Sequence, residues 1–261
     1  ELVDAYPESV MQSDKYERTP LLCHLSCTPS TESNLPGIEY LVQSNPECIK
    51  LVDKDGKNAL HHACNKRGPL SSTVIHYLYE TYPENLITLD SSGRSPLHYL
   101  CEEATDEDLP LFELMHEVTP QSFSLLSKDG LSPLHIVCYS SAWPSNGLVR
   151  FLAEACPLAL RVIAKGATPF HLACMRQNVQ VQVIRFLAKE CPHLLEENME
   201  NSPFHETPLH VLCRNEHIDD ADLRNCLRAL VISKRAVEIF DRHKNSALHT
   251  LCRRRASPKC L

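Results

Sequence analysis

The chain repeats one short motif, and its clearest copy is Gly93-Arg94-Ser95-Pro96-Leu97-His98-Tyr99-Leu100-Cys101. The constant part is a small or hydroxyl residue, Pro or Ala, an apolar residue, His, two further residues and Cys. Six copies place their histidines 37, 37, 36, 39 and 39 residues apart, a regularity that chance does not produce. These histidines are His61, His98, His135, His171, His210 and His249. A period of this length indicates a repeat architecture.

A second marker, a proline, recurs at nearly the same period. Five prolines lie 37, 37, 37 and 35 residues apart, and each precedes the next histidine by 14 to 18 residues; they are Pro46, Pro83, Pro120, Pro157 and Pro192. A degenerate first copy lies upstream of them. It is either Thr19-Pro20-Leu21-Leu22, with Leu22 in place of His, or a register that uses His24 and Cys27. The sequence leaves both registers open.

Each repeat is expected to contain two helices. Ser95 can cap a short first helix, and Pro96 suits the first helical position. After a polar loop, apolar residues at helical spacing predict a second helix, which the proline marker ends. An extended piece such as Leu86 to Leu89 then leads to a tight turn, Asp90-Ser91-Ser92-Gly93, in which glycine takes a positive φ. Neither helix can bury its apolar face alone, so the units must stack into an all-α solenoid.

At this level of detail the motif resembles the ankyrin-repeat signature, in both Gly93 to His98 and Gly166-Ala167-Thr168-Pro169-Phe170-His171. The resemblance implies an ankyrin-repeat solenoid of six to seven helix-turn-helix units with short hairpin-like tips. It covers residues 1–261 as a single domain: a degenerate first repeat over 1–52, regular repeats over 53–252, and a partial last repeat or tail over 253–261. The period exceeds the usual 33 residues or so by about one helical turn. We expect that turn in the second helix or in the connector after it, and an insertion near residues 198–206 to enlarge one tip.

Composition excludes several classes of function. The apolar share of 43% and the charged share of 23% are those of an ordinary soluble protein. A net charge of −7 makes nucleic-acid binding unlikely, and no apolar run approaches the roughly 20 residues of a membrane span. The chain opens at Glu1 without Met and its last copy ends after one helix, so we expect it to be part of a larger protein.

The His-x-x-Cys pairs are the most suggestive chemistry, because residues three apart share a helix face. A zinc site needs about four ligands within roughly 2.3 Å of one point, whereas stacked helices lie about 8–10 Å apart. A structural role is therefore favoured: by the resemblance, each His fixes its turn and each Cys fills a small buried slot. Thirteen free thiols would then indicate a reducing compartment, the cytoplasm or the nucleus. A thiol- or metal-responsive sensor remains the alternative.

Signs of an enzyme are lacking. His116-Glu117 and His205-Glu206 begin like a zinc-protease helix but have no second histidine. With seven glycines in total, the chain has no glycine-rich phosphate loop and no Gly-x-Ser-x-Gly elbow. We therefore expect no catalysis, no cofactor, no metal and no small-molecule substrate.

The ankyrin resemblance implies a non-catalytic scaffold or adaptor that binds a protein or peptide on its concave face. By position it selects the turn tips and the residues just after each ladder cysteine. The tip residues are Lys54, Asp55, Lys57, Ser91, Ser92, Arg94, Lys128, Asp129, Leu131, Lys165, Arg242 and His243. The residues after the cysteines are Asn65, Lys66, Glu102, Glu103, Tyr139, Met175, Arg176, Arg214 and Asn215.

Two further features attract attention. Trp143, the only tryptophan, lies in a loop between two helices and is either an interface anchor or folded back onto its neighbour. Arg253-Arg254-Arg255 is interpreted as a cluster of exposed arginines at a helix end, with a kinase site at Ser257 as the alternative.

Overall fold

The computed structural model describes residues 6–27, 34–65, 72–140, 146–196, 205–230 and 234–255. Lys66, Trp143, Ser257 and most of the insertion near 198–206 lie outside these ranges. The chain forms two compact units, a first unit of Glu1–Glu103 with Asp108–Lys128 and a second unit of Ala104–Glu107 with Asp129–Leu261. No helix in the described ranges combines the length and the apolar character that crossing a membrane requires. The expectation of a single domain stays a prediction.

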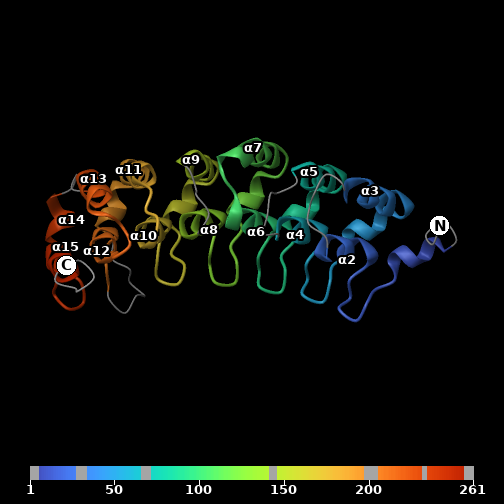
Figure 1. Ribbon diagram of the computed structural model, residues 1–261, viewed down its shortest axis with the longest axis horizontal. Coiled ribbons are helices and arrows are strands. Elements are labelled where there is room, and N and C mark those ends of the chain that lie inside the picture. The colour runs from blue at the N-terminus through green and yellow to red at the C-terminus, as the bar shows by residue number, and fades with distance from the viewer. Residues whose placement is uncertain are drawn as a thin grey trace. The chain divides into compact units, whose positions relative to one another are not determined.

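The first unit consists of helix pairs, each with a turn in front of it (Figure 1). After the 3-10 helix η1 (Pro7–Met11), the first helices of the pairs are α2 (Pro20–Cys27), α4 (Ala59–Cys64) and α6 (Pro96–Glu103). The second helices are α3 (Leu35–Ser44), α5 (Ser72–Thr81) and α7 (Leu109–Val118). The 3-10 helices η3 (Pro46–Lys50), η4 (Pro83–Ile87) and η6 (Pro120–Ser124) follow them, and η5 (Asp106–Asp108) precedes α7.

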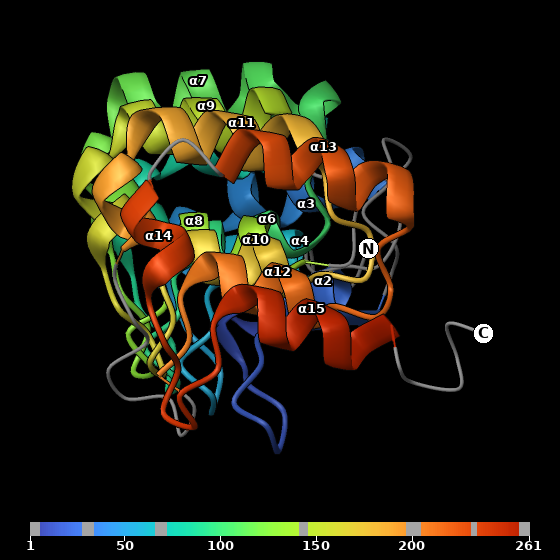
Figure 2. The same ribbon diagram turned by 90° about the vertical axis from the view of Figure 1, so that its left-hand side faces the viewer.

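The second unit repeats this plan. Its first helices are α8 (Pro133–Tyr139), α10 (Pro169–Met175), α12 (Pro208–Arg214) and α15 (Ala247–Arg255). Its second helices are α9 (Asn146–Ala155), α11 (Val181–Glu190) and α13 (Asp220–Leu230), with η7 (Pro157–Arg161), η8 (Pro192–Leu195) and the short α14 (Lys234–Glu238) in the connectors. Figure 2 shows the two layers of this unit, with α9, α11 and α13 above α8, α10 and α12.

Stacking buries the apolar faces, as the periodicity predicts. In the first unit Leu60, Ile75, Leu78, Leu97 and Phe112 are all fully buried between helices. At about 25 cal/mol per Å² of apolar surface removed from water, this burial is the main force holding the pairs together.

Each of the second helices α3, α5, α7, α9 and α11 ends just before a marker proline, as predicted, but the segment after the proline differs from the predicted one. Instead of an extended segment after each proline, the structure has a 3-10 helix that begins at Pro46, Pro83, Pro120, Pro157 and Pro192. Proline fits because its fixed φ suits the first position of a helix, where a missing N–H leaves no bond unmade. The extra turn of the long period thus lies in the connector, one of the two predicted places. Asn85 in η4 fixes it there, because its amide donates to the Ile49 carbonyl at 2.8 Å.

The first repeat uses the Thr19 register. Helix α2 begins at Pro20, and the Leu22 N–H approaches the Thr19 hydroxyl at 3.4 Å. Leu25, in the position of the ladder cysteine, is 1% exposed, whereas Cys27 is exposed. The alternative register through His24 and Cys27 is therefore wrong.

Every turn has a positive φ two residues before the capping residue. Glycine supplies it in four turns, as predicted, and other residues supply it in the remaining three: the positions are Glu17, Gly56, Gly93, Gly130, Gly166, His205 and Lys244. The backbone geometry is thus more regular than the sequence, since tertiary contacts hold a left-handed residue even without glycine.

Candidate functional site

The motif histidines connect neighbouring repeats. Nδ1 of His61 accepts a hydrogen bond from the Asn58 backbone N–H at 3.2 Å, and Nε2 lies 2.9 Å from the Arg94 carbonyl of the next repeat. With its proton on Nε2, the neutral ring donates to that carbonyl and accepts from the Asn58 N–H at the same time. His171 and His210 make the same contact with the next repeat, to the carbonyls of Glu206 and Asn245 at 3.2 and 3.1 Å.

Burial favours this neutral form. It lowers the pKa of His61 to about 4, and desolvation also lowers the pKa of His210. The structure therefore gives these histidines a structural function that depends on their staying uncharged.

Acid is expected to destabilise the first unit through His61. The unfolded chain takes up this proton below pH 6.5 and the folded chain only below about 4, so stability present above pH 6.5 is lost as the pH falls through that window. Between pH 7 and 4.5 the loss from His61 amounts to about 2 kcal/mol. Urea denaturation at both pH values measures it. A His61→Gln variant should lose most of this pH dependence, and an unchanged slope in that variant would assign the effect to other groups.

The ladder cysteines lie in the core, except Cys252 of the last motif copy, which is exposed. Cys64, Cys101, Cys138, Cys174 and Cys213 are all buried. Burial raises the pKa of the Cys64 thiol to about 12, which suppresses the thiolate that metals and oxidants require. The described ranges also contain no group of three or more His, Cys, Asp or Glu side chains that could hold a metal ion. This geometry supports packing and lends nothing to the sensor alternative.

Successive turns of the first unit are hydrogen-bonded to one another. The Lys54 N–H donates to the Tyr16 carbonyl at 3.0 Å, Ser91 N–H to Asp55 at 2.7 Å, and Lys128 N–H to Ser92 at 3.0 Å. The side chains of these tip residues are nevertheless exposed. The result is a rigid row of turns that presents Lys54, Asp55, Ser91, Ser92 and Lys128 to solvent.

A buried carboxylate organises each of two turns. Asp90 accepts hydrogen bonds from the backbone N–H groups of Ser92 and Arg94 at 2.8 and 2.9 Å and from the Tyr99 hydroxyl at 2.6 Å. In the preceding repeat, Asp53 occupies the position of Asp90, and its carboxylate lies 2.9 Å from Nε2 of His62, which occupies the position of Tyr99. Sequence reasoning missed both partners, although each stands directly after a motif histidine.

Two predicted tip residues, Lys57 and Arg94, are engaged within the fold, together with Glu102 after a ladder cysteine. The Arg94 guanidinium lies 4.1 Å from the centre of the Tyr99 ring and 2.5 Å from the Glu102 carboxylate. The Lys57 ammonium approaches the same ring at 5.3 Å. Arg94 and Glu102 therefore stabilise their own repeat, and Lys57 contacts the next one.

The second unit also pairs several of the predicted residues. Lys165 lies 2.9 Å from Asp129 on the neighbouring turn, and both are exposed. Arg214 lies 2.9 Å from Glu206, a carboxyl whose pKa is raised by burial. Leu131 is half-buried, whereas Arg242 and His243 are exposed at the last turn.

The position directly after the ladder cysteine is exposed in both units. It holds Asn65 and Glu102 in the first unit, with Glu103 exposed beside Glu102, and Tyr139, Met175 and Arg214 in the second. Tyr139 and Met175 are 66% and 43% exposed, so in the second unit this row presents two large side chains of apolar character beside Arg214.

The next position along holds the exposed Glu103 in the first unit, but in the second unit it was predicted wrongly. Arg176, Asn215 and Arg254 are each only 8% exposed, so they do not belong to an open surface and Arg254 is not part of an exposed arginine cluster. The Asn215 amide donates to the carbonyls of Cys174 and Arg176 at 2.9 and 2.6 Å, and Arg254 donates to the Ile218 carbonyl. These side chains point back to the preceding repeat, where a helix end leaves carbonyls without helical partners.

Comparison with known proteins bears on the fold. Neither a scan against protein-family models nor a search of curated proteins finds a match. Among solved structures, the chain is similar to the crystal structure of the ankyrin repeat domain of Bcl-3, a unique member of the IkappaB protein family. The two share 17% identity and a TM-score of 0.63, over 89% of this chain and 93% of that one. The chain therefore has the fold of an ankyrin-repeat solenoid.

Proposed function

We propose that this chain is a non-catalytic scaffold or adaptor that binds a partner protein or peptide across its turns and first helices, the face that would be concave in an ankyrin-repeat domain. The ankyrin-repeat fold generally mediates protein–protein interaction. The observation that carries the proposal is the row of hydrogen-bonded turns in the first unit, because it holds the backbone fixed while side chains of different chemistry face solvent. Such a fixed frame with variable tips is typical of a recognition surface, and it loses little entropy on binding.

Exposure at the tips supports four residues as partner contacts in this proposal. Lys54 and Asp55 in the first unit and Arg242 and His243 in the second are exposed. Arg94, by contrast, stabilises its own turn, so its replacement would disturb the fold as well as any interface. The proposal excludes nucleic acid, because the net charge of −7 opposes phosphate binding. It places the protein in the cytoplasm or nucleus, where buried thiols stay reduced.

Charge reversal at the turns is expected to weaken partner binding by at least about tenfold, since desolvated charge pairs at an interface contribute about 2 kcal/mol or more when one member is lost. One variant combines Lys54→Glu with Asp55→Lys, and a second combines Arg242→Glu with His243→Glu. Each is used as bait in affinity capture from native lysate, with the recovered partner quantified against wild type. Lys189→Glu on α11, where the side chain is 83% exposed on a second helix, is the control. Wild-type recovery by both turn variants would refute this proposal.

A further inference from the structure

The second helices of the first unit share an unusual charge. Helices α3, α5 and α7 contain no Lys and no Arg, and their charged side chains are the carboxylates Glu39, Glu80, Glu113 and Glu117. In the second unit the corresponding helices do contain basic residues: Arg150, Arg185, Lys189, Arg224 and Arg228. One layer of the first unit is therefore acidic throughout, on the side of the helix pairs away from the turns.

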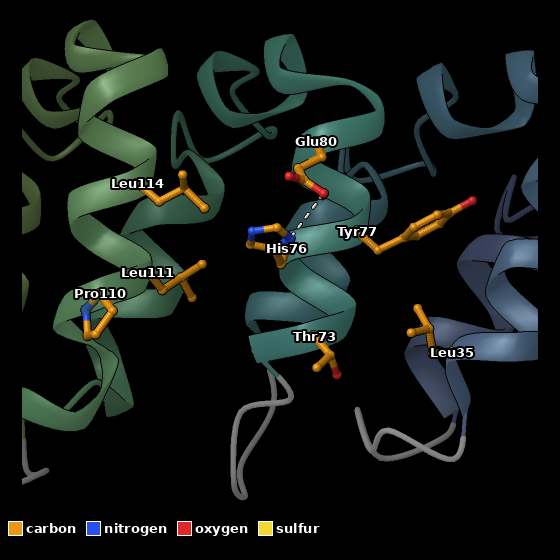
Figure 3. Close-up of a pocket in the computed structure, with 8 residues that line it drawn as sticks. All are labelled: Leu35, Thr73, His76, Tyr77, Glu80, Pro110, Leu111 and Leu114. Atoms are coloured by element: carbon orange, nitrogen blue, oxygen red, sulfur yellow. Dashed lines mark ion pairs between the residues drawn. The ribbon is translucent and has the colours of Figure 1, made fainter.

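An apolar groove lies in this acidic layer. It has a volume of about 590 Å³ and is lined mainly by apolar side chains: Leu35, Tyr77, Pro110, Leu111 and Leu114. Figure 3 shows Leu111 and Leu114 on α7 pointing toward α5, and Tyr77 on the side of α5 that faces Leu35. Exposed apolar surface is costly in water, and a hollow of this kind rimmed by charge marks an interaction site.

Glu80, near the C-terminal end of α5, supplies a charge to the lining of the groove. Its carboxylate lies 3.1 Å from Nδ1 of His76, one helical turn away, and its side chain is 62% exposed. The remaining carboxylates of the layer are Glu39, which is half-buried, and Glu113 and Glu117, which are exposed. A ligand entering this groove thus meets apolar walls and negative charge, with no fixed cation on α3, α5 or α7 to oppose a positive group.

We propose that this groove binds a basic amphipathic helix of a partner protein. Apolar side chains at positions i, i+3, i+4 and i+7 of that helix fill the groove, and its Lys or Arg side chains pair with Glu80 and the neighbouring carboxylates. Helix-in-groove recognition supplies the apolar anchors, and the opposite charges set orientation and exclude acidic segments. This site lies on the second helices and the proposed partner face on the turns and first helices, so the protein would hold two partners at once.

Synthetic peptides test the idea. The probe is a fluorescein-labelled 18-residue peptide of Leu and Lys with all its leucines on one helical face. A scrambled peptide of the same composition and a Leu/Glu peptide of the same pattern are the comparisons. Fluorescence anisotropy at about 0.15 M salt, where the Debye length is about 8 Å, limits binding by diffuse charge alone. We expect the patterned Leu/Lys peptide to bind at least tenfold more tightly than either comparison.

Three variants assign that binding to the groove. Glu80→Lys is expected to weaken this binding at least tenfold, because it replaces the carboxylate in the groove lining with a cation. Leu114→Gln is expected to weaken it about fivefold, because it removes an apolar side chain from the wall of the groove. Glu154→Lys, at the matching penultimate position of α9, should leave it unchanged. Circular dichroism and thermal unfolding confirm that each variant is folded. Equal affinity for the scrambled peptide, or an equal loss with Glu154→Lys, would reduce the effect to net charge and overturn the proposal. Self-association that Glu80→Lys abolishes would make the occupant a second copy of this chain, which also overturns it.

Discussion

Replacing His61 with alanine is expected to lower the free energy of unfolding of the first unit by about 3 kcal/mol. The ring is fully buried and lies between the Asn58 cap of its own helix and the Arg94 carbonyl of the next repeat. Alanine would leave the Asn58 N–H without its partner and would open a cavity between α4 and α6. It would also remove one of the two hydrogen bonds of the Arg94 carbonyl, which still accepts from the Asp90 N–H at 2.9 Å. Each unsatisfied buried group costs about 1–3 kcal/mol. Urea denaturation followed by circular dichroism measures the change.

His249 provides the matched control. It makes the same contacts with its own cap, Nδ1 to the Ser246 hydroxyl at 2.7 Å and to the Ser246 N–H at 3.2 Å, but its side chain is exposed. His249→Ala should therefore cost about 1 kcal/mol, the usual value of a helix cap. Similar losses for the two variants would mean that the histidine acts only as a local cap and not as a bond between repeats.

The sequence predicted the features that depend on local chemistry. Ser132 caps a helix that begins at Pro133, and Gly130, two residues earlier, lies in the turn before it. This motif and its spacing along the chain were enough to predict stacked helix pairs. The capping histidine was assigned its role by resemblance. Its bond to the next repeat adds a contact that no single copy of the motif reveals.

Features that depend on the neighbouring repeat were missed or predicted wrongly. Arg176 and Asn215 look like ordinary exposed polar residues after a short helix, but both are buried. Asn215 donates to carbonyls that only the preceding repeat offers. A signal was present nonetheless, since Arg176, Asn215 and Arg254 stand at one repeat position in succession. The 3-10 helices were missed because a proline has two local effects that the sequence does not separate. It disfavours helical geometry in the residue before it, and it suits the first position of a new helix.

The sequence also contained part of the evidence for the acidic groove. The absence of Lys and Arg from three successive second helices is visible in the sequence, but a charge pattern alone is usually a solvated face. Its meaning changes with the hollow between those helices, which depends on how side chains such as Leu111 and Leu114 pack.

Gly93→Ala is the other substitution with a large expected effect, about 3 kcal/mol of stability lost from the first unit. Gly93 has a φ of +71°, which costs an alanine about 1–2 kcal/mol. A Cβ at this position would also lie 2.8 Å from the Lys128 backbone nitrogen and 3.0 Å from its Cγ. That nitrogen donates to the Ser92 carbonyl, so relieving the clash would separate the two turns. Loss of their contact should appear as faster amide exchange at Lys128 and as a lower urea midpoint.

Gly130→Ala separates the two causes of that loss. Gly130 has nearly the same backbone conformation, with a φ of +77°, but the nearest atoms to its added Cβ lie 3.8 Å away, at ordinary contact distance. Its substitution should therefore lower the free energy of unfolding by only about 1 kcal/mol. This is the cost of a positive φ in alanine, reduced by the smaller conformational entropy of the unfolded alanine chain. If both variants lost the same stability, the close approach at Gly93 would carry no energy, and the hydrogen-bonded row of turns would be looser than its geometry requires. If Gly93→Ala lost about 2 kcal/mol more stability than Gly130→Ala, the packing of one turn against the next would contribute to stability. Such packing gives the rigidity that the proposed partner surface needs.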